Sequence, residues 1–130
     1  MENCIFCKII NRELPAHIIS ENDNVIVFLS LENHPLVIPK KHIKNIYELD
    51  PETGAEIMKE LIKTAKAIKN GLGCDGVYIT QANEPAAGQD VLHIHFHVYP
   101  RWQAQQINKT EKMEETEYLT NLEKIKKALI

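Results

Sequence analysis

The sequence predicts one domain that combines short strands with two longer helices. Most apolar runs are short and lie between turn-forming residues, as in the strands of a sheet. The segment that begins at Asp50-Pro51 instead repeats apolar residues at helical spacing. The chain has 130 residues, which suffice for one hydrophobic core without disulfides.

The N-terminal third of the chain predicts one helical turn followed by three strands. Apolar side chains at helical spacing in residues 5–10 favour the turn, and Leu14-Pro15 ends it. The strands are expected at residues 17–20, 24–30 and 36–38. A polar turn at 21–24 separates the first two strands, and Pro39 closes the third.

The middle of the chain predicts a long helix that packs on the core. Asp50 is a suitable cap, Pro51 suits the first turn, and Gly71 or Gly73 ends the helix. The expected core face consists of Met58, Leu61, Ile62, Ala65 and Ile68. Cys74, just beyond, is expected to be a small turn residue.

Two further strands and a terminal helix complete the expected elements. The strands are predicted at 77–80 and 91–101, with a polar loop at 83–90 between them. A helix is expected over 111–129, where it packs on the domain or on a second subunit. Its apolar face would comprise Met113, Tyr118, Leu122, Ile125 and Leu129.

The strand at 91–101 carries the most informative pattern in the chain. His93, His95 and His97 alternate with apolar residues, and successive side chains of a strand point to opposite faces. Three imidazoles would therefore line one face, although each brings ring nitrogens that need partners. The pattern indicates either a metal site or a histidine that acts as nucleophile or acid–base group. It does not separate these two readings.

Other polar residues have less specific patterns. Cys4 and Cys7 form a Cys-x-x-Cys, which is typical of metal ligands or a redox pair, or are two small buried residues. His34 and His42 flank the strand at 36–38, and His17 is expected to be exposed. The loop at 83–90 has amides that can approach an anion, or it is an ordinary connection.

Composition and charge narrow the range of partners. The chain is 44% hydrophobic and 25% charged, with a net charge of −3, as in ordinary globular proteins. Without a basic stripe, no nucleic-acid partner is expected, although a small phosphate ligand needs only a local site. No apolar run is long enough to span a membrane, and Met1 to Cys4 do not begin a signal peptide. We therefore expect a cytoplasmic protein without a disulfide framework.

Three segments of this chain together resemble the histidine triad (HIT) family, and its Hint-like and bacterial Hit branches most. They are Ile5-Phe6-Cys7-Lys8-Ile9-Ile10, Leu36-Val37-Ile38-Pro39-Lys40-Lys41-His42 and Ala87-Gly88-Gln89-Asp90-Val91-Leu92-His93-Ile94-His95-Phe96-His97-Val98. The resemblance implies an α+β fold, a five-stranded antiparallel sheet with one main helix and a C-terminal helix. It places the HIT domain at residues 1–105 and a C-terminal extension with a helix at 106–130. It also implies a homodimer that joins the sheets of two subunits.

The resemblance further implies a purine nucleotide substrate. Members of this family hydrolyse the bond between a nucleoside α-phosphate and a leaving group such as an amine or a second nucleotide. His95 would be the nucleophile, His97 would stand near the phosphate and leaving group, and His34 would support them. Protonated His97 and Gln89 would stabilise the phosphoryl oxygens.

The remaining implied roles concern the base, the phosphate and a metal. The base pocket would be walled by Ile5, Phe6, Ile9 and Phe28. The phosphate and leaving group would be held by Asn83, Gly88, Gln89 and Asp90. A structural zinc ion would be bound by Cys4, Cys7, His42 and His93, a closed tetrahedral set.

Two departures from the family pattern fall on the nucleoside side of this site. The segment between Phe28 and His34 is shorter than in the family, and Ser30 replaces the acid that holds the ribose hydroxyls. We therefore expect weaker or altered ribose binding, with Glu32 as a substitute ligand.

Four functions remain open from the sequence. The first is a phosphoramidase that acts on adenosine 5′-phosphoramidate-like substrates. The second is a dinucleoside polyphosphate hydrolase, in which Arg101 would reach the extra phosphates. The others are a non-catalytic nucleotide-binding or scaffold protein, and a hydrolase whose catalytic metal is bound by all three triad histidines.

Overall fold

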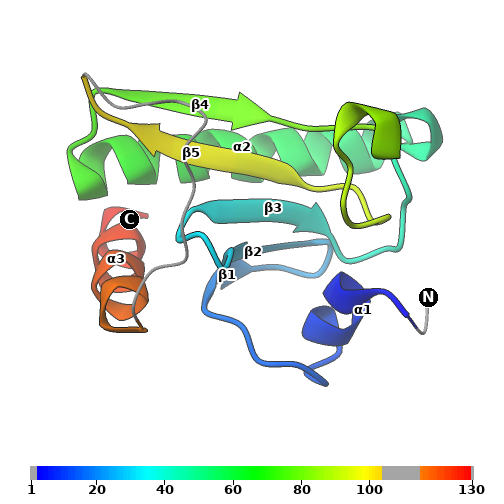
Figure 1. The fold of residues 1–130 in the computed structure, drawn as a ribbon, viewed down its shortest axis with the longest axis horizontal. Coiled ribbons are helices and arrows are strands. Elements are labelled where there is room, and N and C mark those ends of the chain that lie inside the picture. Colours follow the sequence, from blue (N-terminus) through cyan, green and yellow to red (C-terminus); the bar gives the residue numbers. More distant parts are fainter. Residues whose placement is uncertain (1–2, 104–114, 130) are drawn as a thin grey trace.

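The computed structural model describes residues 3–103 and 115–129, which form a five-stranded antiparallel sheet with three helices around it (Figure 1). The strand order is β1-β2-β3-β5-β4. The strands are β1 (Ile18–Glu21), β2 (Val25–Leu29), β3 (Pro35–Pro39), β4 (Gly76–Thr80) and β5 (Phe96–Arg101). The helices are α1 (Ile5–Ile10), α2 (Pro51–Leu72) and α3 (Glu115–Ala128), with short 3-10 turns at Ile46–Glu48 and Pro85–Ala87. The expected fold class is confirmed.

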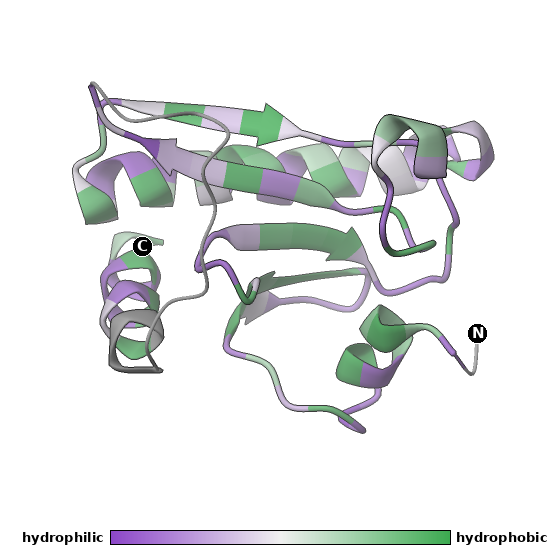
Figure 2. Cartoon of the chain, in the orientation of Figure 1, coloured by the Kyte–Doolittle hydropathy of each residue, from purple (hydrophilic) through white to green (hydrophobic). Residues whose placement is uncertain are grey.

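Alternation along the central strands gives the sheet two different apolar faces. In β2, Val25, Val27 and Leu29 join the core formed with α2 and α3. Ile26 and Phe28, the residues between them, pack with α1 instead. Because both faces of β2 and β3 are covered, every residue of these two strands is buried and the ribbon of β3 is largely apolar (Figure 2).

Helix α2 begins and ends where the sequence predicts, but a different stripe faces the core. The Asp50 carboxylate accepts a hydrogen bond from the Thr53 backbone N–H, and Gly73 ends the helix with φ +65°. The expected core residues Met58 and Ile62 are about half exposed. The buried stripe consists of Ile57, Glu60, Leu61, Thr64, Ala67 and Ile68.

The buried face of α2 differs from the predicted one because a polar residue can be buried at low cost when its polar group is hydrogen-bonded. The Thr64 hydroxyl donates to the Glu60 carbonyl at 2.7 Å, so Thr64 is buried without an unpaired polar group. The helix is then free to turn towards the face that fits the sheet. Cys74 is likewise a buried core residue rather than only a turn residue.

The histidine segment is a strand only in its second half, which corrects the expected strand over 91–101. β5 begins at Phe96, where its residues pair with β3 and β4. In this register Pro39 of β3 comes opposite Ile94 but has no backbone N–H to donate, and β4 ends at Thr80, opposite His97, so residues 91–95 are not part of the ladder. The Ile94 N–H donates instead to the Ile43 carbonyl at 2.7 Å. This break lets the first two triad histidines leave the sheet in different directions.

Helix α3 packs against α2 and contributes to the same core. Ile125 is fully buried, and Leu122, Ala128 and Leu129 pack around it. The helix was expected to pack on the domain or on a second subunit, and it packs on the domain. The predicted residues 111–114 and the side chain of Tyr118 lie outside the described residues. No helix within residues 3–103 and 115–129 is long and apolar enough to cross a membrane.

Candidate active site and metal site

A cavity of about 600 Å³ lies on the α1 side of the sheet. Its apolar wall includes the four residues predicted for the base pocket, Ile5, Phe6, Ile9 and Phe28. The ring of Phe6 lies edge-on to the rings of Phe28 and His95, with centroid distances of 5.6 and 5.0 Å. The apolar wall therefore leads directly to the triad histidines.

The polar end of the cavity is formed by Asp90, His95 and His97. Ser30 and Glu32 also line it, from the hairpin between β2 and β3. His17, expected to be exposed, is half-buried before β1 and lines the cavity as well. The sequence pattern did not indicate this position, because His17 lies just before β1 and takes no part in the alternation of that strand.

His95 is held with one ring nitrogen towards the backbone and the other towards the cavity. Its Nδ1 lies 2.8 Å from the His93 carbonyl oxygen, which can only accept a hydrogen bond. Nδ1 therefore carries a hydrogen, and in the neutral imidazole Nε2 has the lone pair. Nε2 lies 3.5 Å from Oδ1 of Asp90, an exposed carboxylate. This orientation suits attack on an electrophile in the cavity.

His97 and His34 form a hydrogen-bonded pair beside His95. Nε2 of His34 lies 2.9 Å from Nδ1 of His97. Burial, then the neighbouring His97, lowers the pKa of His34 to about 3. Burial, then His95, lowers the pKa of His97 to about 4. Both imidazoles are thus neutral near pH 7 in this structure, whereas we expected a protonated His97. An anionic phosphate would oppose this shift.

An aromatic stack continues from His97 along the same face of β5. The ring of Tyr99 stacks on His97 at 5.5 Å and on Tyr78 of β4 at 5.7 Å. The Arg101 guanidinium lies over the Tyr99 ring at 4.7 Å from its centroid. Arg101 does not line the cavity. No role was predicted for Tyr99, although its position two residues after His97 places it on the histidine face.

The amides predicted to hold the phosphate instead bind backbone groups. The Gln89 amide donates to the carbonyls of Lys44 and Val91 at 2.7 and 3.1 Å, and its oxygen accepts from the Glu84 N–H. Asn83 Oδ1 accepts from the Ile46 N–H at 2.8 Å. Neither residue lines the cavity, and nor does Gly88, whose φ is +96°. Their role in phosphate binding stays a prediction.

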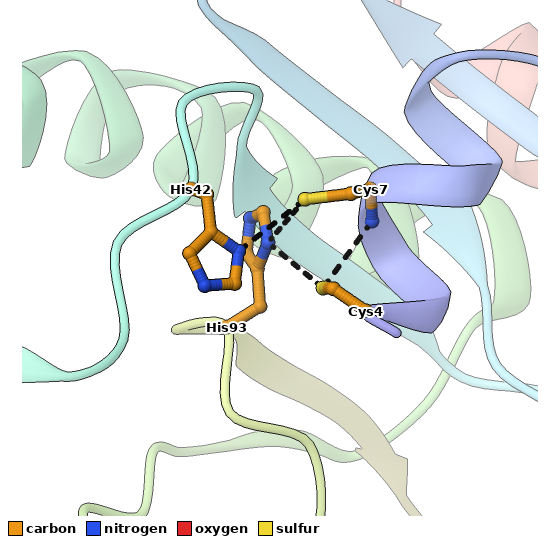
Figure 3. A group of neighbouring side chains, drawn as sticks. All are labelled: Cys4, Cys7, His42 and His93. Carbon is orange, nitrogen blue, oxygen red and sulfur yellow. Dashed lines mark hydrogen bonds between the residues drawn. The ribbon is translucent and has the colours of Figure 1, made fainter. Parts of the chain in front are cut away.

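The first triad histidine belongs to a separate cluster at α1. The ligand atoms of Cys4, Cys7, His42 and His93 all lie within 4.8 Å of one another. Figure 3 shows the two imidazoles facing the two cysteines of the N-terminal turn. Nδ1 of His93 is 3.4 Å from Cys4 Sγ, and Nδ1 of His42 is 3.3 Å from Cys7 Sγ.

These distances match a tetrahedral zinc site. Bonds of about 2.3 Å to sulfur and about 2.0 Å to nitrogen place the two ligand atoms about 3.5 Å apart. Nε2 of His93 lies 2.8 Å from the Pro39 carbonyl oxygen, so this nitrogen carries the hydrogen and Nδ1 faces the cysteines. Burial raises the pKa of Cys7 to about 11, and burial lowers that of His93 to about 4. A metal would stabilise the thiolate that is unfavourable without it.

The two sites divide the triad between them. His93 lies with the cysteines, whereas His95 and His97 line the cavity. Within residues 3–103 and 115–129, no group of metal-ligand type contains all three histidines. This arrangement disfavours the hydrolase with three histidine ligands.

The chain is similar in sequence to known proteins. The HIT domain family model matches residues 11–104 of the chain. An uncharacterized HIT-like protein of Methanocaldococcus jannaschii is 41% identical over 104 residues, covering 77% of this chain and 80% of that protein. An adenosine 5′-monophosphoramidase of Schizosaccharomyces pombe is 36% identical over 103 residues, covering 76% of this chain and 74% of that protein.

The similarity extends to solved structures. The crystal structure of a Zn-bound histidine triad family protein from Mycobacterium smegmatis has a TM-score of 0.87 and 32% sequence identity to this chain. The match covers 98% of this chain and 94% of the other. The family model spans most of the described sheet and the histidine segment. This chain therefore belongs to the HIT domain family.

Proposed function

We propose that this protein is a nucleotide hydrolase that cleaves nucleoside 5′-phosphoramidate-type bonds through a nucleotidyl-histidine intermediate. The observation that carries the proposal is the orientation of His95. Its Nδ1–H is bound to a backbone carbonyl, and its Nε2 lone pair faces a cavity with an apolar wall. The related phosphoramidase of Schizosaccharomyces pombe adds independent support.

The proposed reaction has two displacements at the α-phosphorus. In the first, His95 Nε2 forms a bond to phosphorus, the bond to the leaving amine breaks, and the amine takes up a proton. In the second, water displaces His95 and releases the nucleoside monophosphate. The sum is one phosphoramidate and one water giving AMP and an amine. The apolar wall would hold the base, with Phe6 placed between the base and His95.

Charge near the nucleophile favours an amine over a second phosphate as leaving group. The Asp90 carboxylate lies 3.5 Å from His95 Nε2, at the polar end of the cavity. It would attract a protonated amine and repel an anionic polyphosphate. Arg101, which would have to reach additional phosphates, lies over Tyr99 outside the cavity lining. Dinucleoside polyphosphate hydrolysis is therefore the second candidate.

The ribose side of the proposed site differs from the family pattern. Glu32 lines the cavity and is the acid we propose to bind the ribose hydroxyls. Calorimetry with AMP and 2′,3′-dideoxy-AMP tests this role. A modest loss of affinity for the dideoxy compound is expected in the wild type, and a smaller loss in Glu32→Gln; a large loss in the wild type would refute weaker ribose binding. Equal affinities for the two ligands would contradict the role of Glu32.

We further propose that Cys4, Cys7, His42 and His93 bind a structural zinc ion. Such an ion would fix the N-terminal turn, which carries the apolar wall, to the segments before β5. The Zn-bound relative and the ligand-atom spacing support this assignment. Zinc would then act on stability rather than on the reacting phosphorus.

The assembly expected for this chain also remains a proposal. β4 is an edge strand, and its Tyr78 and Ile79 are nearly half exposed, which suits pairing with a second subunit. We propose a cytoplasmic homodimer of this kind, with purine nucleotides as ligands. The proposed division between a HIT domain at 1–105 and an extension at 106–130 falls within residues outside the description.

The decisive experiment is AMP release from adenosine 5′-phosphoramidate and from diadenosine tetraphosphate. Wild type should prefer the phosphoramidate, and His95→Ala should lose more than about a thousandfold in kcat because the covalent route is removed. Met58→Ala, on the outer face of α2, is the matched control. Preference for the tetraphosphate would favour the second candidate. AMP binding without turnover of either compound would indicate a non-catalytic nucleotide-binding protein.

A further inference from the structure

The two departures from the family pattern have one structural consequence, a hairpin that joins Ser30 to His34. β2 ends at Leu29, opposite Pro35 of β3, and only five residues connect them. The Ser30 N–H donates to the His34 carbonyl at 2.8 Å, which closes the hairpin. Ser30 Oγ then lies 3.0 Å from Nδ1 of His34. In this short connection, the Ser30 side chain reaches the histidine pair directly.

The hydrogen bonds to Ser30 fix the direction of its own hydrogen. Its Oγ accepts from the backbone N–H of Glu32 at 3.2 Å and from that of His34 at 3.3 Å. A hydroxyl has two acceptor lone pairs and one hydrogen. Because both lone pairs have donors, the third contact uses the hydrogen, and Ser30 donates to His34 Nδ1.

The direction of this hydrogen bond sets the tautomers of both imidazoles. If His34 accepts at Nδ1, its neutral ring carries the hydrogen on Nε2, which then donates to Nδ1 of His97 at 2.9 Å. The Tyr99 hydroxyl lies farther from the same Nδ1, at 3.4 Å. His97, which lines the cavity, must then carry its hydrogen on Nε2, at the far side of its ring.

We propose that Ser30 is a positioning residue that sets the tautomers of His34 and His97, so that His97 presents an N–H donor to the substrate. This inference rests on the proposed function and deepens it. A neutral His97 in this tautomer donates a hydrogen bond to a phosphoryl oxygen or the leaving group without needing a proton from solvent. An acid at position 30 would instead accept from His34 Nδ1 and reverse the direction of the whole chain.

The assigned role differs from that of a ribose ligand. Ser30 lines the cavity, so its hydroxyl could in principle meet the ribose. Its one hydrogen is used by His34, and both its lone pairs are used by the hairpin. The ribose therefore gains nothing from Ser30, and removal of this hydroxyl should act on turnover rather than on affinity.

The first test reads the tautomers in the ligand-free protein. Two-bond ¹H–¹⁵N correlation spectra at pH 7 show which nitrogen of each imidazole carries hydrogen. Both His34 and His97 are expected to be protonated on Nε2 in the wild type and in Ser30→Thr, which keeps the hydroxyl. Ser30→Ala should show a mixture. Hydrogen on Nδ1 of His97 in the wild type, or tautomers unchanged in Ser30→Ala, would overturn the proposal.

The second test separates positioning from ribose binding. With adenosine 5′-phosphoramidate, Ser30→Ala should lower kcat about tenfold, the value of one hydrogen bond, and leave KM unchanged. The 2′,3′-dideoxy substrate should show the same loss, and Ser30→Thr should restore the rate. A rise in KM confined to the substrate with ribose hydroxyls would make Ser30 a ribose ligand instead. If the wild type hydrolyses no phosphoramidate, the proposed function fails while the spectra still decide the tautomers.

Discussion

The buried His34 should make the stability of this protein sensitive to mild acid. His34 is 3% exposed, and burial together with His97 lowers its pKa to about 3 from an ordinary value of 6.5. Below pH 6.5 the unfolded chain therefore binds a proton that the folded protein excludes. The stabilising effect of neutral His34 is complete above pH 6.5 and is lost as the pH falls towards 3. Between pH 7 and pH 5 this group alone should lower the free energy of unfolding by about 2 kcal/mol.

Urea unfolding at pH 7 and pH 5 measures this loss, with His34→Gln as the comparison. The variant cannot titrate at this position, so its loss over the same interval should be smaller by about 2 kcal/mol. Both proteins are measured at one zinc concentration, so that any pH dependence of the metal site is common to them. The absolute stability of the variant does not enter the comparison. Equal losses in the two proteins would refute the reasoning and indicate that His34 is solvated or already charged at pH 7.

Three further variants test the packing and the metal site. Cys7→Ser should reduce zinc from about one per chain and lower the melting temperature, as measured by metal analysis and calorimetry; full zinc content in the variant would exclude Cys7 as a ligand. A Cβ at Gly71 would lie 2.6 Å from the Lys124 carbonyl oxygen, so Gly71→Ala should destabilise by about 1–3 kcal/mol and expose α3 to protease. The control is Gly54→Ala, where a Cβ would make only ordinary contacts with Leu49. This variant should stabilise the protein by about 0.5–1 kcal/mol through helix propensity. If both substitutions changed the free energy of unfolding in the same direction, the close packing of α3 would be contradicted. Gln89→Ala leaves three backbone groups without their partner and should cost about 2–3 kcal/mol by the same assay, whereas unchanged stability would show that water replaces the amide.

Features set by residues close in the sequence were predicted correctly more often than features set by distant contacts. Asp50 and Gly73 end α2 as predicted, because caps depend on residues within one turn. The predicted core face of the same helix was wrong at Met58 and Ile62, because the sheet decides which side of the helix packs against it. Thr64 is buried because of a hydrogen bond that hydropathy does not register.

The triad shows the same limit within a few residues. Alternation predicted that His93, His95 and His97 share one strand face, but β5 begins only at Phe96. β4 ends at Thr80, opposite His97, and Pro39 of β3 has no N–H for the ladder, so the Ile94 N–H binds the Ile43 carbonyl instead and the backbone leaves the sheet before Phe96. His93 then meets cysteines from the N-terminal turn, while the other two histidines line the cavity.

The sequence by itself determined the elements of this protein and the chemical types gathered in it. Strand and helix periodicity, turn residues, the Cys-x-x-Cys and the histidine triad are all local patterns, which the chain carries wherever it folds. Only the tertiary structure decided which of these residues act together. The triad is divided between two sites, each of which gathers residues from different segments. The hydrogen bonds from Ser30 to His34 and from His34 to His97 also join different segments. Such contacts depend on strand register and on where each ladder ends, and these are set by the packing of the whole sheet.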